Sequence, residues 1–442
     1  MTFPTHFMWG AATASYQIEG AIHQDGRKDC IWDKLAKGHV PFDETGEIAC
    51  DHYNHLEEDV ALLKQIGLKA YRFSIAWPRI IPNGTGNINQ KGLDFYLKLV
   101  KLLKEANIEP MVTLYHWDLP YDLFLQGGWK NENSPLWFES YVRVVVNALA
   151  PYVKYFITFN EPNCFIGISY EGAEHAPFLN EPSSLLPCTR NVLLAHGRAV
   201  HVIRELAPHA QIGYAPTGAI YTPTDNSKDA IDSARDLTFS STRSAFSTDW
   251  WIDPVILGSF HQNALAKMGV TEVFTKDEWA LVTSKIDFLG FNVYQSTGQE
   301  VAGSKYPSNR YCGSPVTAMD WTITPESIYY AVKFLQDRYH LPILITENGM
   351  ANTDFLMLDG KIHDPQRIDF MHRYLLALEK AIDEGYDVIG YTYWSLMDNY
   401  EWACGYKYRF GLIYVDYQTQ KRTLKDSAKW YKEVIATNGQ NL

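Results

Sequence analysis

The chain has 442 residues and a formal net charge of −12 at pH 7. An acidic balance of this size argues against nucleic acid and against an anionic membrane as partners. Hydrophobic residues make up 46% of the sequence, which is ordinary for a globular protein with a large core, and no apolar run approaches the length of a transmembrane helix. We therefore expect neither nucleic acid nor a membrane among its partners.

The six cysteines are scattered along the chain without a CxxC pair. This is a poor disulfide framework for a protein of this size, so we expect reduced thiols. The N-terminus has no basic segment followed by an apolar stretch, and Phe3–Ala12 already has the pattern of folded structure. We expect a cytoplasmic protein. Because no HExxH and no clustered Cys/His spacing occurs, we predict no metal site and no cofactor.

Short β-like runs alternate with longer helical patterns from one end of the chain to the other. In chain order, the predicted strands are Met8–Ala12, Ala70–Ile75, Pro110–Tyr115, Tyr155–Phe159, Gln211–Ala215, Ile286–Phe291, Ile343–Thr346 and Val388–Tyr393. The clearest helical patterns start at Leu56 and stop at Gly67, span Leu93–Ala106, and begin at Thr324-Pro325. Such an alternation predicts parallel strands that are joined by helical crossovers.

Strand and helix alternating eight times predict an α/β fold of the (β/α)8 TIM barrel type. A length of 442 residues alone would favour two or three domains, but α/β barrels routinely exceed that guide as one domain. The alternative is an open doubly wound sheet, but no Gly-rich phosphate loop follows the first predicted strand. No linker, repeat or low-complexity segment interrupts the pattern. We therefore predict one catalytic domain over residues 1–442, with the active site at the C-terminal ends of the strands.

Two of the predicted strands run into a carboxylate. Glu161 ends the apolar run in FITFNEP, and Glu347 ends the one in LPILITENG. If both strands belong to one barrel, both acids lie on the same rim, and paired carboxylates on a rigid rim are the groups that break a glycosidic bond. Each acid alone also has a structural interpretation, since a residue before proline favours an extended strand end. Polar and aromatic residues also follow nearly all of the remaining strands, which favours a site at this rim.

The segments at the strand ends closely resemble those of the family 1 glycoside hydrolases, the retaining β-glucosidases and their relatives. The resemblance covers almost the whole chain and rests on an ordered set of motifs: FMWGAATASYQIEGA, ACDHYNHLEEDV, YRFSIAWPRI, TLYHWDLP, FNEPN, IDFLGFNVY, ITENGMA, YWSLMDNYEWACGYKYRFGLIYVDY and KRTLKDSAKWY. It implies a β-glucosidase that hydrolyses terminal β-D-glucosyl residues through a covalent glycosyl-enzyme. The expected substrate is a small-molecule β-glycoside or oligosaccharide, and β-galactosidase and β-fucosidase activities overlap in this family.

The resemblance also implies roles for individual residues. Glu347 matches the nucleophile, and Glu161 matches the acid that protonates the leaving oxygen and then, as a base, activates water. Four further residues match residues that support the two acids in the family. Arg72 and Tyr294 match those that contact the nucleophile, Asn160 matches the one that binds the sugar 2-hydroxyl, and Asn292 is the fourth. The matched substrate contacts are Gln17, His116, Trp117, Glu401 and Trp402 at the other hydroxyls, Trp394 as the stacking platform of the glycone, and Trp321 at the leaving-group sugar. In isolation, His116 would be interpreted as a structural histidine and Arg72 equally as part of a structural ion pair.

Comparison with related activities narrows the range of expected substrates. Glu161 is present where the myrosinase branch lacks the acid, so an O-glycoside is expected. The 6-phospho-β-glycosidases carry Ser, Lys and Tyr where this chain has Glu401, Tyr408 and Phe410. A carboxylate at the first position would repel a phosphate by about 1 kcal/mol at 4 Å in bulk water. Transglycosylation through the same intermediate stays an alternative, and a non-catalytic sugar-binding barrel is disfavoured because both carboxylates are intact.

Two departures from the family pattern concern the leaving group. Asn163, after NEP, is often Trp in relatives, and Asp320, before Trp321, is often Gly. Both positions are expected where the leaving group passes, so they affect its selection and leave the mechanism unchanged. For a retaining mechanism we expect the Glu161 and Glu347 carboxyl groups to lie roughly 5–5.5 Å apart.

Overall fold

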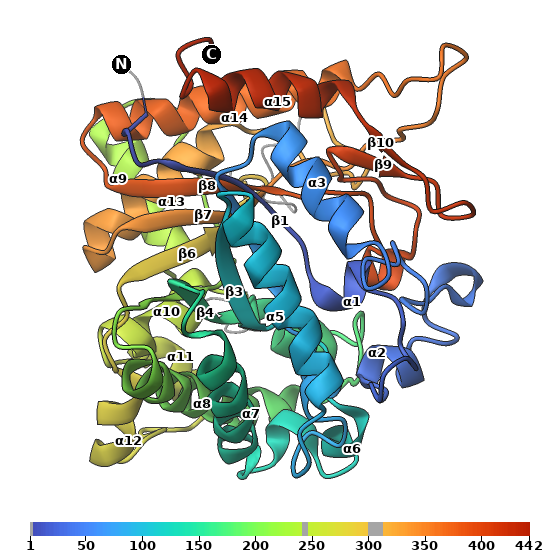
Figure 1. Ribbon diagram of the computed structural model, residues 1–442. Helices are drawn as coiled ribbons and strands as arrows, with labels where there is room; N and C mark the ends of the chain where they lie inside the picture. The colour runs from blue at the N-terminus through green and yellow to red at the C-terminus, as the bar shows by residue number, and fades with distance from the viewer. Residues whose placement is uncertain (1–2, 241–245, 299–312) are drawn as a thin grey trace.

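The computed structural model describes residues 3–240, 246–298 and 313–442. Its centre is a closed barrel in which each strand pairs in parallel with the next and β8 pairs with β1 (Figure 1). The strands are β1 (Met8–Ala12), β2 (Ala70–Ser74), β3 (Glu109–Tyr115), β4 (Tyr155–Asn160), β5 (Gln211–Ala215), β6 (Phe288–Asn292), β7 (Ile343–Asn348) and β8 (Val388–Trp394). The predicted (β/α)8 barrel is thus confirmed, with strand ends that differ from prediction by one or two residues.

Helices surround the barrel (Figure 1). The longer ones are α3 (Leu56–Ile66), α5 (Gln90–Glu105), α7 (Ser134–Leu149), α8 (Leu185–Leu206), α9 (Lys228–Thr238), α10 (Thr248–Ile256), α13 (Glu326–Tyr339), α14 (Pro365–Asp383) and α15 (Asp426–Ala436). Short helices are α1 (Ser15–Ile18), α2 (Ile31–Leu35), α4 (Trp77–Ile80), α6 (Tyr121–Phe124), α11 (Gln262–Lys267) and α12 (Lys276–Val282). Outside the barrel, β9 (Ile413–Val415) and β10 (Arg422–Leu424) form an antiparallel pair.

Several shorter turns of helix lie in the loops: the 3₁₀ turns η1 (Pro41–Asp43), η2 (Gly128–Lys130), η4 (Pro182–Ser184) and η5 (Trp402–Cys404), and the π-helix η3 (Asn163–Glu171). The predicted stop at Gly67 is confirmed, because this glycine has a φ of 81° and its N–H bonds the Leu63 carbonyl, which is a left-handed helix cap. The predicted start at Thr324-Pro325 was one residue early: α13 begins at Glu326, and Pro325 caps it.

The barrel interior is apolar at one end and polar at the other. One buried cluster takes a residue from each of six successive strands: Ala70, Met111, Ile157, Ala215, Phe288 and Leu344. Two residues further along their strands, Arg72, Thr113 and Thr346 are also buried and are bonded to one another or to the neighbouring polar groups. Because side chains alternate along a strand, the apolar layer closes one end of the barrel and the polar layer forms the floor of a site at the C-terminal ends.

An irregularity in the pairing of β4 with β5 turns an additional polar side chain, that of Asn160, inward. In β4, Ile157 belongs to the interior cluster, Thr158 bonds His196 of α8, Phe159 packs on Phe138 of α7, and Asn160 again faces the interior. The pairing of β4 with β5 shifts register between Ile157 and Asn160. Such a bulge breaks the two-residue alternation and re-aims the side chain that follows it.

Candidate active site

Glu347 lies near the end of β7, and both of its carboxyl oxygens have donors. Oε1 accepts a hydrogen bond of 2.6 Å from Arg72 Nη1, and Oε2 accepts one of 2.7 Å from the Tyr294 hydroxyl. The register of β7 shifts against both neighbours around this point, so Thr346 and Glu347 both reach the site although they are consecutive. A charge-assisted pair of this kind stabilises an ionised carboxylate.

The glycine of the ITENG motif, Gly349, lies where there is no room for a side chain. A Cβ atom at Gly349 would lie 1.8 Å from the carbonyl oxygen of Trp394. The end of β7 therefore passes directly against the end of β8, and a side chain at this position would push Glu347 and Trp394 apart.

Arg72 joins Glu347 to the rest of the polar layer. Nε donates to Thr113 Oγ1 (3.1 Å), Nη1 also donates to the Thr346 carbonyl (3.1 Å), and Nη2 donates to Asn160 Oδ1 (2.6 Å). The guanidinium is fully buried. A buried cation is stable only where its donors are paired, and here the pairing fixes it in one orientation.

Two asparagines, Asn160 and Asn292, connect Arg72 to Glu161 through hydrogen bonds. Asn292, at the end of β6, accepts from the Thr346 hydroxyl at Oδ1 (2.6 Å), which leaves both hydrogens of its Nδ2 as donors. That nitrogen bonds Asn160 Oδ1 (2.9 Å) and Glu161 Oε1 (2.7 Å). The sequence predicted Asn160 and Asn292 as support, but it gave no reason to include Thr346, which sets the direction of the Asn292 amide.

Glu161 has a backbone conformation that a side chain rarely adopts. Its φ is 46°, and its N–H bonds the carbonyl of Ala215 at the end of β5 (2.9 Å). Trp117 and Trp402 also have positive φ, at 77° and 50°. Left-handed conformations of non-glycine residues cost about 1–3 kcal/mol each and persist where the surroundings hold them, most often at functional sites.

The two carboxyls have different electrostatic environments. Burial, followed by the charge of Glu347, raises the pKa of Glu161 to about 7. Burial also raises the pKa of Glu347, but the Arg72 guanidinium and the Tyr294 hydroxyl act against it. Since only Glu347 is paired with a cation, the state in which Glu347 is ionised and Glu161 is protonated is favoured near neutral pH.

The tautomer of His116 follows from its neighbour. Because Asn160 Oδ1 accepts from Arg72 and Asn292, the Asn160 Nδ2 must be the atom 3.0 Å from His116 Nε2, and it donates to that nitrogen. The proton of the neutral ring then lies on Nδ1, which is buried and bonds no partner in the described parts of the chain. Burial, helped by the Arg72 charge, lowers the pKa of His116 well below its usual value, so the ring stays neutral and offers one donor.

The remaining predicted contacts, apart from Trp321, lie close to one another around His116 and Glu401. Gln17 Nε2 donates to the Tyr400 carbonyl (2.8 Å) and lies 3.4 Å from Glu401 Oε2. Burial and the charge of Glu347 raise the pKa of Glu401 to about 8. Aromatic rings pack beside these groups. The ring centroids of Trp117 and Trp402 are 4.6 Å apart, and the rings of Trp394 and Trp402 stack on His116.

The loop that carries Glu401 is held from behind by buried ion pairs. Asp398 Oδ1 accepts from Lys425 Nζ (2.6 Å) and from the Gly411 N–H (2.9 Å), and Oδ2 accepts from Arg409 Nη1 (2.7 Å). Lys425 also bonds Asp354 (2.5 Å) and directly precedes α15. These partners of Asp398 thus lie behind the loop, and Asp398 supports the loop that carries Glu401.

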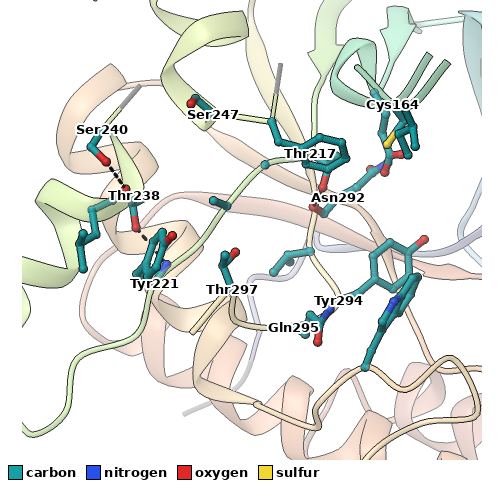
Figure 2. A pocket seen from close by; sticks show the side chains of 18 residues that line it. Cys164, Thr217, Tyr221, Thr238, Ser240, Ser247, Asn292, Tyr294, Gln295 and Thr297 are labelled. Carbon is teal, nitrogen blue, oxygen red and sulfur yellow. Dashed lines mark hydrogen bonds between the residues drawn. The ribbon is translucent and has the colours of Figure 1, made fainter. Parts of the chain in front are cut away.

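A cavity of about 840 Å³ is lined by Glu161 and extends to Thr238 of α9 and to Ser247, which precedes α10. Figure 2 shows Thr238 and Ser247 together with other side chains that line it. Its wall near the carboxylate is formed by Asn292, Tyr294 and Trp321, and the Tyr294 and Trp321 rings are 5.1 Å apart. Further in, the described lining residues are uncharged: Ile168, Thr217, Gly218, Ala219, Tyr221, Leu237, Thr238, Ser240, Phe246, Ser247, Val293, Gln295 and Thr297. Cys164 also lines it, and burial beside Glu161 raises the pKa of this thiol.

The two departures from the family pattern receive physical explanations. Asp320 has a φ of 59°, the left-handed region that glycine enters most easily, which accounts for the glycine of relatives. Asn163 is buried, and its Oδ1 accepts from the Thr217 N–H (3.3 Å) on the cavity wall. Asn163 itself does not line the cavity, so its effect on the leaving group is indirect.

All of the predicted site residues therefore lie in one connected arrangement. Glu161, Glu347, Arg72, Asn160, Asn292, Tyr294 and His116 are joined by hydrogen bonds, Trp117 donates to the Asn160 carbonyl, and the others pack beside them. Within the described ranges, no group of three or more His, Cys, Asp or Glu side chains is arranged to hold a metal ion, and no helix has the length and apolarity to cross a membrane.

Comparison with known proteins gives a consistent result. The model of the family described as "Glycosyl hydrolase family 1" matches residues 1–440. Beta-glucosidase A of Acetivibrio thermocellus is 42% identical over 455 residues, covering 99% of both proteins, and Beta-glucosidase A of Thermotoga maritima is 40% identical, covering 99% of this chain and 98% of that protein. A solved structure of beta-glucosidase from Thermotoga maritima in complex with castanospermine superposes with a TM-score of 0.91 at 41% identity, over 99% of both chains. The chain belongs to glycosyl hydrolase family 1.

Proposed function

We propose that the protein is a retaining β-glucosidase that cleaves terminal β-D-glucosyl residues from neutral small-molecule glycosides, including cellobiose. The observation that carries this proposal is the unlike pair of buried carboxyls, Glu347 bonded to Arg72 and Tyr294, and Glu161 bonded to Asn292 beside the cavity. One ionised and one protonated carboxyl on the same rim are what a double displacement requires.

In the first step Glu347 attacks the anomeric carbon from one face while Glu161 gives its proton to the departing oxygen on the other. The glycosidic C–O bond breaks as the ester bond to Glu347 forms, and the leaving group departs as a neutral alcohol. In the second step Glu161, now ionised, takes a proton from water, and the water oxygen displaces Glu347. Asn160 has one N–H beyond the one bonded to His116, and it is available to the sugar 2-hydroxyl.

The surroundings of Glu401 support an unphosphorylated sugar. Its hydrogen-bonding side chain is Gln17, and the charged groups that influence its pKa are Glu347 and Glu161, both acidic. A phosphate on the sugar would need a cation at this position. The complete catalytic pair supports an enzyme over a non-catalytic sugar-binding barrel, and transfer to a sugar acceptor uses the same intermediate.

The stereochemistry of the product tests the mechanism. Because Glu347 displaces the leaving group and is then itself displaced, an aryl β-glucoside should first release β-glucose, with α-glucose appearing only at the rate of mutarotation. Proton NMR of the anomeric signals in the first minutes of the reaction measures this. If α-glucose appears first, the enzyme inverts and Glu347 is not a nucleophile.

A second test concerns Glu401. Glu401→Ser should lower kcat/KM on β-glucosides about 10- to 100-fold, since hydrogen bonds between sugar hydroxyls and the Glu401 carboxyl group are lost. The melting temperature should stay equal or rise, because the change removes a buried carboxyl that lies near two others. Kinetics and thermal unfolding on the same preparation separate the two effects, and an unchanged rate would remove Glu401 from the sugar site.

We also propose that residues 1–442 form one catalytic domain and that the protein works in the cytoplasm. The barrel uses strands from Met8 to Trp394, which supports one domain. Five cysteines in the described ranges are free thiols, consistent with a reducing compartment, and Cys312 lies outside those ranges.

A further inference from the structure

Gln295 stands directly after Tyr294 and lines the cavity beside it (Figure 2). Its Oε1 accepts two hydrogen bonds from one residue, the Thr322 N–H at 2.9 Å and the Thr322 hydroxyl at 3.2 Å. Two donors on the carbonyl oxygen fix which end of the amide faces Thr322, so Nε2 is directed elsewhere. No acceptor in the described parts of the chain bonds that nitrogen.

Thr322, which orients Gln295, directly follows an aromatic residue of the cavity wall. Thr322 follows Trp321, and the Trp321 and Tyr294 rings are 5.1 Å apart. An indole face and an amide with two unused hydrogens therefore border the same space. A sugar ring has an apolar face and a rim of hydroxyls, which suits this combination, whereas an unsubstituted aryl group would use only the indole.

The cavity supports a neutral occupant of more than minimal size. Its volume of about 840 Å³ is in the range that holds a substantial organic ligand. Among its described lining residues, Glu161 is the only carboxyl group, and none is Lys, Arg or His. A leaving group that carried a phosphate or carboxylate would find no cation among these described residues.

We infer that Gln295 selects the leaving group, its Nε2 donating to a hydroxyl of a neutral sugar whose ring lies on Trp321. The substrate class is then β-linked glucosyl disaccharides and short oligosaccharides, with simple aryl glucosides served by the same catalytic pair without this contact. The inference rests on the proposed β-glucosidase function and adds a residue that acts on one half of the substrate.

The test compares two substrates that share the glucosyl unit and differ in the leaving group. Gln295→Met keeps the length of the side chain and removes both donors. We expect kcat/KM on cellobiose to fall about three- to tenfold, the loss of one neutral hydrogen bond, while kcat/KM on phenyl β-glucoside changes less than about twofold. The matched control is Gln262→Met, an exposed glutamine at the start of α11, which should change neither value.

A second measurement locates the contact. Cellobiose analogues that lack one hydroxyl of the reducing-end unit should each be assayed with the wild type and with Gln295→Met. For one analogue the two enzymes should give equal kcat/KM, because the hydroxyl that Gln295 binds is already absent. An equal fall on cellobiose and phenyl β-glucoside, or no change on cellobiose, would overturn the inference. If the wild type hydrolyses neither substrate, the proposed function itself fails.

Discussion

Replacement of Glu347 by glycine should reduce kcat on aryl β-glucosides at least about 10⁴-fold, because the nucleophile is removed from a set of residues that work as a unit. The space left beside Arg72 and Tyr294 should admit a small anion, since both donors lose their acceptor. Azide bound there would attack from the face that Glu347 uses, so the product should be the α-glucosyl azide. Product analysis by NMR measures both the loss and the rescue.

Glu347→Gln is the matched variant for this prediction. It keeps the size of the side chain and an oxygen that can accept from Arg72, but the amide is not a nucleophile, so it should be as inactive as the glycine variant. It should also unfold at nearly the wild-type temperature, which shows that inactivity does not result from misfolding. A Glu347→Gly enzyme with normal activity would contradict the mechanism outright.

Replacement of Glu161 by alanine should affect substrates according to their need for a proton. We expect kcat/KM to fall about 10²- to 10⁴-fold on phenyl β-glucoside, whose leaving group must be protonated, and to change little on 2,4-dinitrophenyl β-glucoside. Azide should restore turnover of the latter and give the β-glucosyl azide, because it replaces water on the face opposite Glu347. The two azide products thus have opposite configurations and assign the two carboxyls to opposite faces of the sugar.

The pH profile gives a further criterion for Glu161. In the proposed mechanism the acid form of Glu161 is the active one. Because burial raises its pKa to about 7, wild-type kcat/KM should decline as the pH rises through about 7. At low pH the decline should come from protonation of Glu347. In Glu161→Ala the alkaline decline should disappear and the acid one remain, while Glu174→Ala, an exposed change in the same loop, should keep both. An alkaline decline that survives in Glu161→Ala would assign it to another group.

The sequence was sufficient to predict the barrel because the two patterns that indicate it are local. These are the alternation of strand-like runs with helical runs and the helical spacing of apolar residues. Leu56, Val60 and Leu63 repeat at helical spacing, and Gly67 ends that helix in the predicted place. Resemblance then supplied the site residues, and the structure brings those residues together. The carboxyl groups could be assigned to one rim because parallel strands in a barrel all end on the same side.

What could not be predicted depends on places where side chains stop alternating between the inside and the outside of the barrel along a strand. Thr346 and Glu347 are consecutive, yet both reach the site, and Thr158 and Phe159 both contact outer helices. The shifts in register that cause this arise from pairing between strands distant in sequence, so no local pattern reveals them. The direction of the Asn292 amide, set by Thr346, and that of Gln295, set by Thr322, are likewise visible only after folding.

The ion pairs around Asp398 bear on how the protein can be engineered. Lys425 lies more than 260 residues after Glu161 in the sequence, yet its ammonium group bonds Asp398 in the loop that carries Glu401. Asn438, after α15, likewise bonds the Phe3 carbonyl (2.7 Å) and the Trp9 indole (2.9 Å) at the first strand. A shortened chain that ends before Lys425 would lose the ion pair that holds this loop, so a truncation from the C-terminal side should keep both Lys425 and Asn438.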